Sequence, residues 1–486
     1  MGRHRAGDHS RDDRPLVAVV GGGITGLAAA WALANAPDAP RVVVLEAAGR
    51  VGGKLAVGEL DGVTVDLGAE SMLARRPEAL DLVRQVGLAD DLLTPRAVGA
   101  RVWSRGALHP LPTGTLMGVP SGVDGLTGLL APDEVAAVRA EPRRQWPPIT
   151  ADVDVASFVR ARVGAGVAER LVEPLLGGVY AGRAERLSLQ ATVPALWSAA
   201  TAGGSVVDAA AAAARAGAST RSPVFAGLRG GVGRLPMALA DALRARGVEV
   251  VTGSTVRALR RVPNGWRLTV GATRDEQAVD VQAVVLATPA GPTSRLLSDE
   301  VASAVTVLAS IQYAGVAIVT MLLPRATAAA LNGSGFLVPP VEGRFVKAAT
   351  FSSAKWSWLD AAHPERVVVR TSVGRHGETA DLQRDDDDLV ARAVADLADL
   401  VGTALPVQAS LVTRWGGGLP QYEVGHLQRV AAVRQALAAA PGVVVAGAAY
   451  EGVGIAACVA SGTQAAVGVL THLDALAARA RHWPDE

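Results

Sequence analysis

Cysteine is almost absent from this sequence, since Cys458 is the only one in 486 residues. A single cysteine cannot form an intramolecular disulfide bond or a cysteine metal cluster, and this scarcity is typical of a reducing cytoplasm. We expect Cys458 to be a small buried apolar residue. The sequence therefore predicts a cytoplasmic protein that is long enough for two or three domains, each with its own apolar core.

An excess of charge of either sign is also missing, because 47 Lys and Arg residues balance 46 Asp and Glu residues. This balance gives no reason to expect a nucleic acid as partner. The sequence contains no Ser/His/Asp set, no His-x-x-x-His pair and no paired catalytic carboxylates. Four consecutive acids, residues 385–388, stand at the start of an expected helix, where they are typical caps, and we predict no metal site.

Long uncharged stretches are few. Two of them, residues 301–324 and 452–472, contain no Asp, Glu, Lys or Arg and reach the length of a membrane span. The first ends in an alternating β-branched run, which predicts a strand, and the second predicts a loop followed by a core helix. Peripheral membrane contact stays open. The first fourteen residues are polar and charged, and they predict a disordered tail rather than a signal peptide.

What the sequence does contain is a glycine-rich turn between a strand pattern and a helix pattern, in LVAVVGGGITGLAAAWAL, residues 16–33. Gly21, Gly23 and Gly26 fit G-x-G-x-x-G. In this pattern the first glycine permits a tight turn, the second lets backbone approach a pyrophosphate, and the third lets helix pack on strand. The phosphates would lie at the helix N-terminus, where N–H groups and the positive end of the dipole face them.

A second predicted strand, residues 41–45, ends in Glu46, which follows Gly26 by 20 residues. A carboxylate at this place is typical of a contact to a ribose hydroxyl, and it disfavours a 2′-phosphate, so NADP is the less favoured occupant. The two patterns together form a complete βαβ fingerprint. They indicate a Rossmann-like domain of the α/β class.

After this unit the regular alternation of strands and helices stops. Residues 113–200 show Pro-interrupted helical patterns, in which Asp154 and Ser157 are candidate caps, and they predict a helical insertion. Alternation returns at residues 230–251 and is followed by a hairpin whose turn we assign to Asn264 and Gly265. The whole pattern is that of an α+β multidomain protein.

Two further glycine-rich segments extend the fingerprint. Residues 47–71, AAGRVGGKLAVGELDGVTVDLGAES, resemble the extended FAD motif of the amine-oxidase and porphyrinogen-oxidase superfamily. Residues 443–470, VVVAGAAYEGVGIAACVASGTQAAVGVL, resemble the second flavin segment of that superfamily. Two such segments, about 400 residues apart, favour FAD as a long cofactor held by both ends of a chain.

The resemblance becomes closer in four segments: LVEPLLGGVYAGRAERLSL (171–189), GALHPLPTG (106–114), RWGGGLPQYEVGH (414–426) and YEGVGIAAC (450–458). They resemble the porphyrinogen oxidases of haem synthesis, most of all the bacterial coproporphyrinogen III oxidases. The resemblance implies oxidation of coproporphyrinogen III to coproporphyrin III, which removes six electrons in three hydride transfers to flavin. It also implies O2 as acceptor and hydrogen peroxide as product. Since the flavin carries the hydride step, no catalytic side chain is expected.

Three rival functions stay open. The first is oxidation of protoporphyrinogen IX, which has two vinyls where coproporphyrinogen III has two more propionates, so the two substrates differ in the number of cations that they need. The second is an amine oxidase, and the third is a flavin-binding protein without turnover. A haem-pathway enzyme passes its product on, so the resemblance also implies transient contact with a ferrochelatase, in the cytoplasm or peripherally at the inner face of the membrane.

The resemblance further implies how the chain divides. We expect a discontinuous Rossmann-like FAD-binding domain, a substrate-binding domain with a mixed or antiparallel sheet, and a helical domain that meets the bilayer in membrane-bound relatives. The expected boundaries are residues 15–75, 225–298 and 408–475 for the first domain, 76–112, 191–224 and 299–407 for the second, and 113–190 for the third, after a tail of residues 1–14.

Carried onto matching positions, the resemblance implies a set of FAD contacts. They are Gly21, Gly22, Gly23, Ile24, Thr25, Gly26, Glu46, Lys54, Gly68, Ala69, Glu70, Ser71, Val256, Trp415, Val453, Gly454 and Ile455. The superfamily often has Arg in place of Lys54, and lysine keeps the charge but loses the planar fork.

For the substrate, the resemblance implies Arg101 as a propionate contact and Tyr180 as a residue lining the same cavity. We expect apolar walls, to which two or three of the nine tryptophans contribute. His109 and His426 lie in matching segments, where we expect each to make a structural hydrogen bond.

Overall fold

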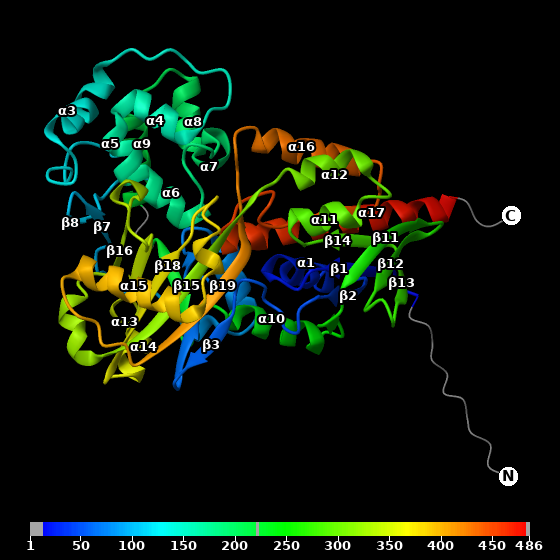
Figure 1. The fold of residues 1–486 in the computed structure, drawn as a ribbon. Helices are drawn as coiled ribbons and strands as arrows, with labels where there is room; N and C mark the ends of the chain where they lie inside the picture. Colours follow the sequence, from blue (N-terminus) through cyan, green and yellow to red (C-terminus); the bar gives the residue numbers. More distant parts are fainter. Residues whose placement is uncertain (1–12, 220–222, 483–486) are drawn as a thin grey trace, which may run out of the picture.

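The computed structural model describes residues 13–219 and 223–482, so residues 1–12 of the predicted tail lie outside the described part. Figure 1 shows a body built around a parallel sheet, a second body around a larger sheet beside it, and a group of short helices at one end. This arrangement confirms the expected multidomain fold of α/β class.

A five-stranded parallel sheet forms the centre of the first body, in the order β10-β2-β1-β14-β20. The pairing of β1 with both β2 and β14 confirms the predicted βαβ unit. Both faces of the sheet are covered, which explains why its strands are almost continuous apolar runs. The strands are β1 (Leu16–Val20), β2 (Arg41–Leu45), β10 (Glu249–Val251), β14 (Ala283–Leu286) and β20 (Val443–Val445).

Helices cover one face of this sheet, and a small antiparallel sheet with further helices covers the other. The first face carries α1 (Ile24–Ala34), α2 (Pro77–Gln85), α10 (Arg234–Ala245) and α17 (Ile455–His482). The second carries β11 (Val256–Val262), β12 (Gly265–Val270), β13 (Gln277–Val281), α11 (Ala290–Leu296), α12 (Ala302–Ala309) and α16 (His426–Leu437). Two of these elements, α2 and α12, fall in segments that we had expected in the substrate-binding domain.

The C-terminal helix α17 lies along α1, although the two are separated by most of the chain (Figure 1). Gly462 makes this approach possible, because a Cβ atom there would lie 2.2 Å from the carbonyl oxygen of Thr25. By length and composition, Ile455–Arg479 could cross a membrane. Its packing against α1 is that of the core helix predicted for residues 452–472.

The second body is built on a seven-stranded mixed sheet, in the order β19-β15-β18-β17-β16-β7-β8, in which only β16 and β7 are parallel. One face packs under helix α15 (Asp386–Val401). Its strands are β7 (Arg101–Ser104), β8 (Ala107–Pro110), β15 (Tyr313–Pro324), β16 (Gly335–Leu337), β17 (Ala348–Phe351), β18 (Arg366–Val373) and β19 (Ala409–Pro420). This confirms the strand expected at the end of residues 301–324, and it places β19 here instead of with the parallel sheet.

Several short elements connect the two sheets. The hairpin β3 (Val57–Leu60) and β4 (Val63–Asp66) packs on Trp356 and Leu359, at helices α13 (Ser352–Lys355) and α14 (Ser357–Ala362). A small sheet joins β5 (Met72–Leu73), β9 (Phe225–Leu228) and β6 (Leu92–Leu93). The chain therefore crosses from the first body to the second before β3, and it returns to the first body after β4.

The helical group has an apolar core of its own. Its helices are α3 (Pro132–Ala140), α4 (Val155–Val163), α5 (Ala165–Val167), α6 (Glu173–Tyr180), α7 (Leu189–Thr192), α8 (Pro194–Thr201) and α9 (Val206–Ser219). The core extends past the predicted limit at residue 190, because Leu196 of α8 and Val206 of α9 are fully buried in it.

Local predictions can be compared with the caps and turns. Asp154 caps α4 by accepting from the Ser157 N–H (2.7 Å), and Asp385 caps α15. The hairpin turn lies one residue earlier than predicted, at Pro263 and Asn264, because Val262 pairs with Gly265. Gly265 serves another purpose, since a Cβ atom there would lie 2.2 Å from the carbonyl oxygen of Val281 in the neighbouring strand.

Candidate functional site

The glycine turn between β1 and α1 has the geometry that its sequence predicts. Gly21 has a φ of +108°, and a Cβ atom on Gly26 would lie 1.9 Å from the carbonyl oxygen of Gly21. Gly23, the N-cap of α1, is different, because no atom lies within 4 Å of the position of its Cβ. The N-terminus of α1 is therefore open at Gly23 and can be approached by a phosphate group.

Glu46 closes one side of this turn. Its carboxylate accepts hydrogen bonds from the Gly22 N–H (2.6 Å) and the Ala48 N–H (2.7 Å). The Ser254 N–H donates to the backbone oxygen of Glu46 (2.8 Å), so the segment that leads to Val256 in β11 runs beside it. The fold thus brings together Glu46, which is the predicted ribose contact, the glycine turn and the start of β11.

The next loop of the predicted FAD motif lies against the same turn. The Gly52 N–H donates to the Gly22 carbonyl (2.8 Å), and the position of a Cβ on Gly53 is 3.5 Å from Gly23 Cα. Lys54 is exposed to solvent, but enough protein surrounds it that burial lowers the pKa of its amine. The loop that carries Lys54 therefore lies against the glycine turn.

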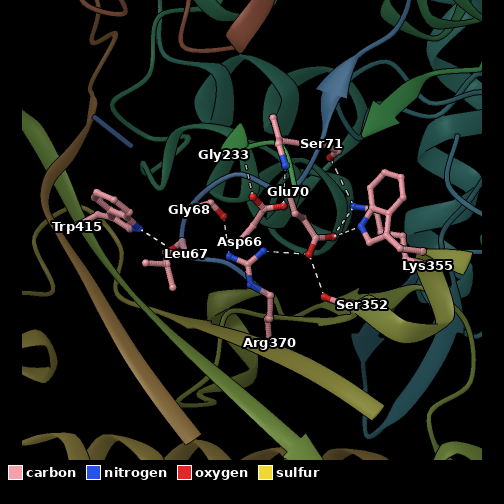
Figure 2. A network of polar contacts seen from close by, with 12 residues as sticks. Asp66, Leu67, Gly68, Glu70, Ser71, Gly233, Ser352, Lys355, Arg370 and Trp415 are labelled. Carbon is pink, nitrogen blue, oxygen red and sulfur yellow. Dashed lines mark hydrogen bonds and ion pairs between the residues drawn. The ribbon is translucent and has the colours of Figure 1, made fainter. Parts of the chain in front are cut away.

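Residues 66–71 form a segment that we call the flavin loop, and two side chains, Trp415 and Arg370, hold its backbone (Figure 2). Trp415 Nε1 donates to the Leu67 carbonyl (2.9 Å), and Arg370 Nη2 donates to the Gly68 carbonyl (2.6 Å). A Cβ atom on Gly68 would lie 2.0 Å from the Lys54 carbonyl oxygen, so this position requires glycine. Trp415 and Gly68, both predicted FAD contacts, are thus neighbours.

Glu70 is the centre of a buried polar network in this loop (Figure 2). Its carboxylate accepts from Lys355 Nζ (2.7 Å), Arg370 Nη1 (2.9 Å) and Ser352 Oγ (2.9 Å). Burial alone would raise the pKa of Glu70, but Lys355 and Arg370 together lower it to about 2. The carboxylate is therefore ionised and bound to the larger sheet, so the predicted FAD contact of Glu70 could come only from its backbone.

Nothing in the local sequence of Lys355 and Arg370 distinguishes them from surface cations, so the sequence does not predict their place in this network. Asp66 was likewise quoted in the motif without a role. It accepts from the Val232 N–H (3.1 Å) and the Gly233 N–H (2.9 Å) at the start of α10. Burial raises the pKa of Asp66 to about 6, in spite of these two hydrogen bonds.

The C-terminal flavin segment approaches from the other end of the chain. Tyr422 fixes it, since its hydroxyl accepts from the Gly452 N–H (2.7 Å) and donates to the Ala448 carbonyl (2.6 Å). Val453 and Gly454 follow, and no atom lies within 4 Å of the Cβ position of Gly454, just before α17 begins at Ile455. Cys458, in the first turns of α17, is buried as predicted.

Aromatic rings connect this segment to α6. The rings of Tyr180 and Tyr422 have centroids 5.6 Å apart, and Tyr422 stacks on His426 at 3.9 Å. Burial raises the pKa of Tyr180 to about 12, so its phenol is neutral. The predicted cavity residue Tyr180 therefore lies one ring away from the flavin segment.

The two histidines differ in role. His109 Nε2 forms the expected structural hydrogen bond, to the Ser104 carbonyl oxygen (3.1 Å). The hydrogen bond expected for His426 is not formed at ordinary distance among the described residues, although the Ala449 backbone lies close enough to favour the protonated ring. Burial lowers the pKa of His426 to about 4, so a neutral ring packs against Tyr422 by stacking instead.

Arg101 is the first residue of β7, and its guanidinium makes no hydrogen bond or ion pair with the described residues. Trp103, two residues further, packs in the core under α15, so strand alternation places Arg101 on that side of the sheet. Val102 packs with Tyr180 in the core of the helical group. A substrate beside Tyr180 would therefore reach the Arg101 guanidinium only around the end of β7.

These features suit a dinucleotide that carries a flavin. The backbone is open at Gly23 and Gly454, with no atom within 4 Å of either Cβ position, and Glu46 lies against the glycine turn. No cluster of three or more metal-binding side chains occurs in residues 13–219 and 223–482.

A family model described as flavin containing amine oxidoreductase matches residues 24–470. The chain belongs to this family. The match confirms the predicted flavin cofactor, and with the dinucleotide fingerprint it identifies FAD as the cofactor of this flavin oxidoreductase.

Individual relatives cover almost the whole flavin oxidoreductase. The coproporphyrinogen III oxidase of Mycobacterium tuberculosis is 36% identical over 466 residues, which is 95% of this chain and 98% of the relative. The protoporphyrinogen oxidase of Bos taurus is 30% identical and is covered over 98% of its length, with 93% of this chain. A crystal structure of a candidate protoporphyrinogen oxidase from Exiguobacterium sp. 255-15 has 30% identity and a TM-score of 0.82, and the match covers 95% of this chain and 99% of that one. The resemblance to porphyrinogen oxidases is thereby confirmed.

Proposed function

We propose that this flavin oxidoreductase oxidises coproporphyrinogen III to coproporphyrin III, with O2 as electron acceptor and hydrogen peroxide as product. The observation that carries the proposal is that Tyr422 holds the flavin segment at Gly452 while its ring lies 5.6 Å from the ring of Tyr180. A flat tetrapyrrole needs an apolar aromatic wall beside the flavin, and this arrangement offers one. The name of the Mycobacterium tuberculosis relative supports the same substrate.

The residues of this chain bind and orient in this proposal. Gly23 and Gly454 leave room for the cofactor, Glu46 takes the ribose, and Trp415 holds the flavin loop through Leu67. The chemistry that FAD supplies when bound is the acceptance of two electrons at a time, so the removal of six electrons requires three turnovers. Tyr180, as a neutral phenol, lines the cavity without adding charge, and Arg101 remains the proposed propionate contact.

The partners and the location belong to the same proposal. We place the enzyme in the cytoplasm, with peripheral contact at the inner face of the membrane and transient contact with a ferrochelatase that takes the product. Cross-linking of the two purified enzymes tests this contact. Absence of any association, with product transferred at the rate of free diffusion, would contradict it.

Protoporphyrinogen IX oxidation is the second candidate, and the names of the Bos taurus and Exiguobacterium relatives favour it. The test is aerobic turnover of the purified yellow protein with each porphyrinogen, followed by porphyrin fluorescence and by peroxide. We expect rapid formation of coproporphyrin with about three peroxides per ring, and slower formation of protoporphyrin. Bound FAD with no porphyrin from either substrate would refute the proposal and favour an amine oxidase or a non-catalytic flavoprotein.

A further inference from the structure

The larger sheet has one face, here called the inner face, that α15 does not cover. On this face Arg370 of β18 reaches the Gly68 carbonyl in the flavin loop (2.6 Å). Further along, Leu337 of β16 approaches α6, with its Cδ2 atom 3.8 Å from the position of a Cβ on Gly178. The inner face therefore looks onto the flavin loop and onto the helix that ends in Tyr180.

Accessible space remains over the inner face between these two contacts. One row of register partners crosses β15, β18, β17 and β16, and all four of its members are half-buried, whereas the residues under α15 are buried. The row consists of Ile318, Ser372, Ala348 and Leu337. The flavin loop and α6 thus lie over this part of the sheet but leave the side chains of the row partly accessible to solvent.

A β-bulge turns Lys347 onto this row. The Lys347 N–H donates to the Ser372 carbonyl (2.9 Å), while Ala348 is the register partner of the same Ser372, so two residues stand opposite one. Val346 and Ala349 on either side both pack in the core under α15. Lys347 and Ala348 therefore share the inner face, where such bulges commonly re-aim a side chain next to a site.

The ammonium group of Lys347 has no partner among residues 13–219 and 223–482. The residue is 7% exposed, and no described residue forms a hydrogen bond or ion pair with Nζ. Nζ is also absent from the unpaired polar atoms that are sealed from solvent, so it reaches the accessible space. Glu378 is the carboxylate whose charge acts on Lys347. It is already bound by Arg183, and it also lies 3.7 Å from Arg375. An unpaired buried ammonium favours an incoming carboxylate.

We infer that Lys347 binds a propionate carboxylate of the substrate and so selects a tetrapyrrole with four propionates over one with two. The inference rests on the proposed function and names a specificity residue within it. The charges around Lys347 support this assignment, because Arg375 adds positive potential and Glu378 is shared among cations.

The same geometry predicts how binding depends on pH. The charged groups that face Lys347 are Arg375 and Glu378, with Arg183 and Glu173 behind them in the helical group. Burial, together with Arg375, lowers the pKa of Lys347 to about 7. The free site therefore loses its charge as the pH rises through about 7, and affinity for a carboxylate falls with it.

The experiment compares Lys347→Met with Lys347→Arg in the FAD-loaded, full-length protein. We expect Lys347→Met to lower kcat/KM for coproporphyrinogen III about 10-fold or more, mainly through KM, and to change the value for protoporphyrinogen IX about 2-fold or less. Lys347→Arg should retain discrimination. Titration with coproporphyrin III should show affinity that declines above pH 7 in the wild type and does not decline in Lys347→Arg.

A matched control is Arg344→Met, which removes a cation three residues away that pairs with Asp399 of α15 on the other side of the sheet. It should leave the ratio of the two substrates unchanged. Equal effects of Lys347→Met on both substrates, or none on either, would overturn the inference while the wild type still oxidises coproporphyrinogen III. A wild type that oxidises neither porphyrinogen would overturn the proposed function itself, and the inference with it.

Discussion

Replacing Glu70 by Gln should destabilise the protein strongly, although the two side chains have nearly the same size. The change leaves Lys355 and Arg370 without their shared counter-charge, and their side chains are only 17% and 9% exposed. Removing one partner of a buried ion pair costs about 3–5 kcal/mol. At roughly 2 °C per kcal/mol for a chain of this size, the melting temperature should fall by about 6–10 °C.

The assay is thermal unfolding, followed by circular dichroism and by the fluorescence of released flavin. Flavin should leave Glu70→Gln before the fold melts, because Arg370 also holds the Gly68 carbonyl of the flavin loop. The pKa of Glu70 is about 2, against a usual value of 4.5, so its stabilisation is complete above pH 4.5 and is lost as the pH falls through about 2. The difference between variant and wild type should therefore shrink as the pH falls from about 4.5 to about 2.

The matched control is Glu78→Gln, which breaks the pair between Glu78 and Arg76, whose side chains are 29% and 47% exposed. Exposed pairs contribute about 0–1 kcal/mol, so this melting temperature should change by about 2 °C at most. If Glu70→Gln melted within about 2 °C of the wild type at pH 7, the reasoning about the buried network would be refuted.

The remaining predictions concern the cofactor turn, Asp66 and Trp415. Gly23→Ala should melt like the wild type but bind FAD at least about 10-fold more weakly, since its Cβ would occupy the space through which a phosphate approaches α1. Gly26→Ala should instead fail to fold well, because its Cβ would collide with the carbonyl oxygen of Gly21. FAD content and thermal unfolding distinguish the two, and equal behaviour would contradict the assigned roles. Burial raises the pKa of Asp66 from the usual 3.8 to about 6, so the wild type should lose roughly 3 kcal/mol of stability as the pH rises through that range. Asp66→Asn should not lose it, and melting curves that run parallel from pH 4.5 to 8 would count against this account. Trp415→Phe removes the hydrogen bond to Leu67 and should weaken FAD binding about 2-fold to 10-fold, measured by fluorescence titration of the apoprotein.

The features that could be predicted from the sequence are those in which cause and effect are close along the chain. Gly21, Gly23 and Gly26 act within one turn, and the predicted role of each agrees with its geometry. Asp385 likewise caps the helix that starts beside it. Such local patterns identified the parallel sheet, the caps and the order of the flavin segments.

The features that could not be predicted depend on contacts between distant residues. Glu70 meets Lys355 and Arg370 across 285 and 300 positions, and nothing near either cation indicates this. The bulge at Lys347 is visible only once the strand register is known. The position of Arg101 could not be predicted for the same reason. Side chains alternate along β7, so the side of the sheet on which Arg101 lies depends on where Trp103 packs.

The packing of α17 on α1 has a consequence for synthesis of the protein. Gly462 fits against Thr25, and Val453 and Gly454 complete the flavin segment, so segments translated far apart in time are needed side by side. A ribosome-bound chain can form the glycine turn early, but it cannot complete the flavin segment until residues 453–462 have emerged. Cofactor loading should therefore follow the synthesis of α17, because a chain truncated before α17 would lack part of its flavin segment.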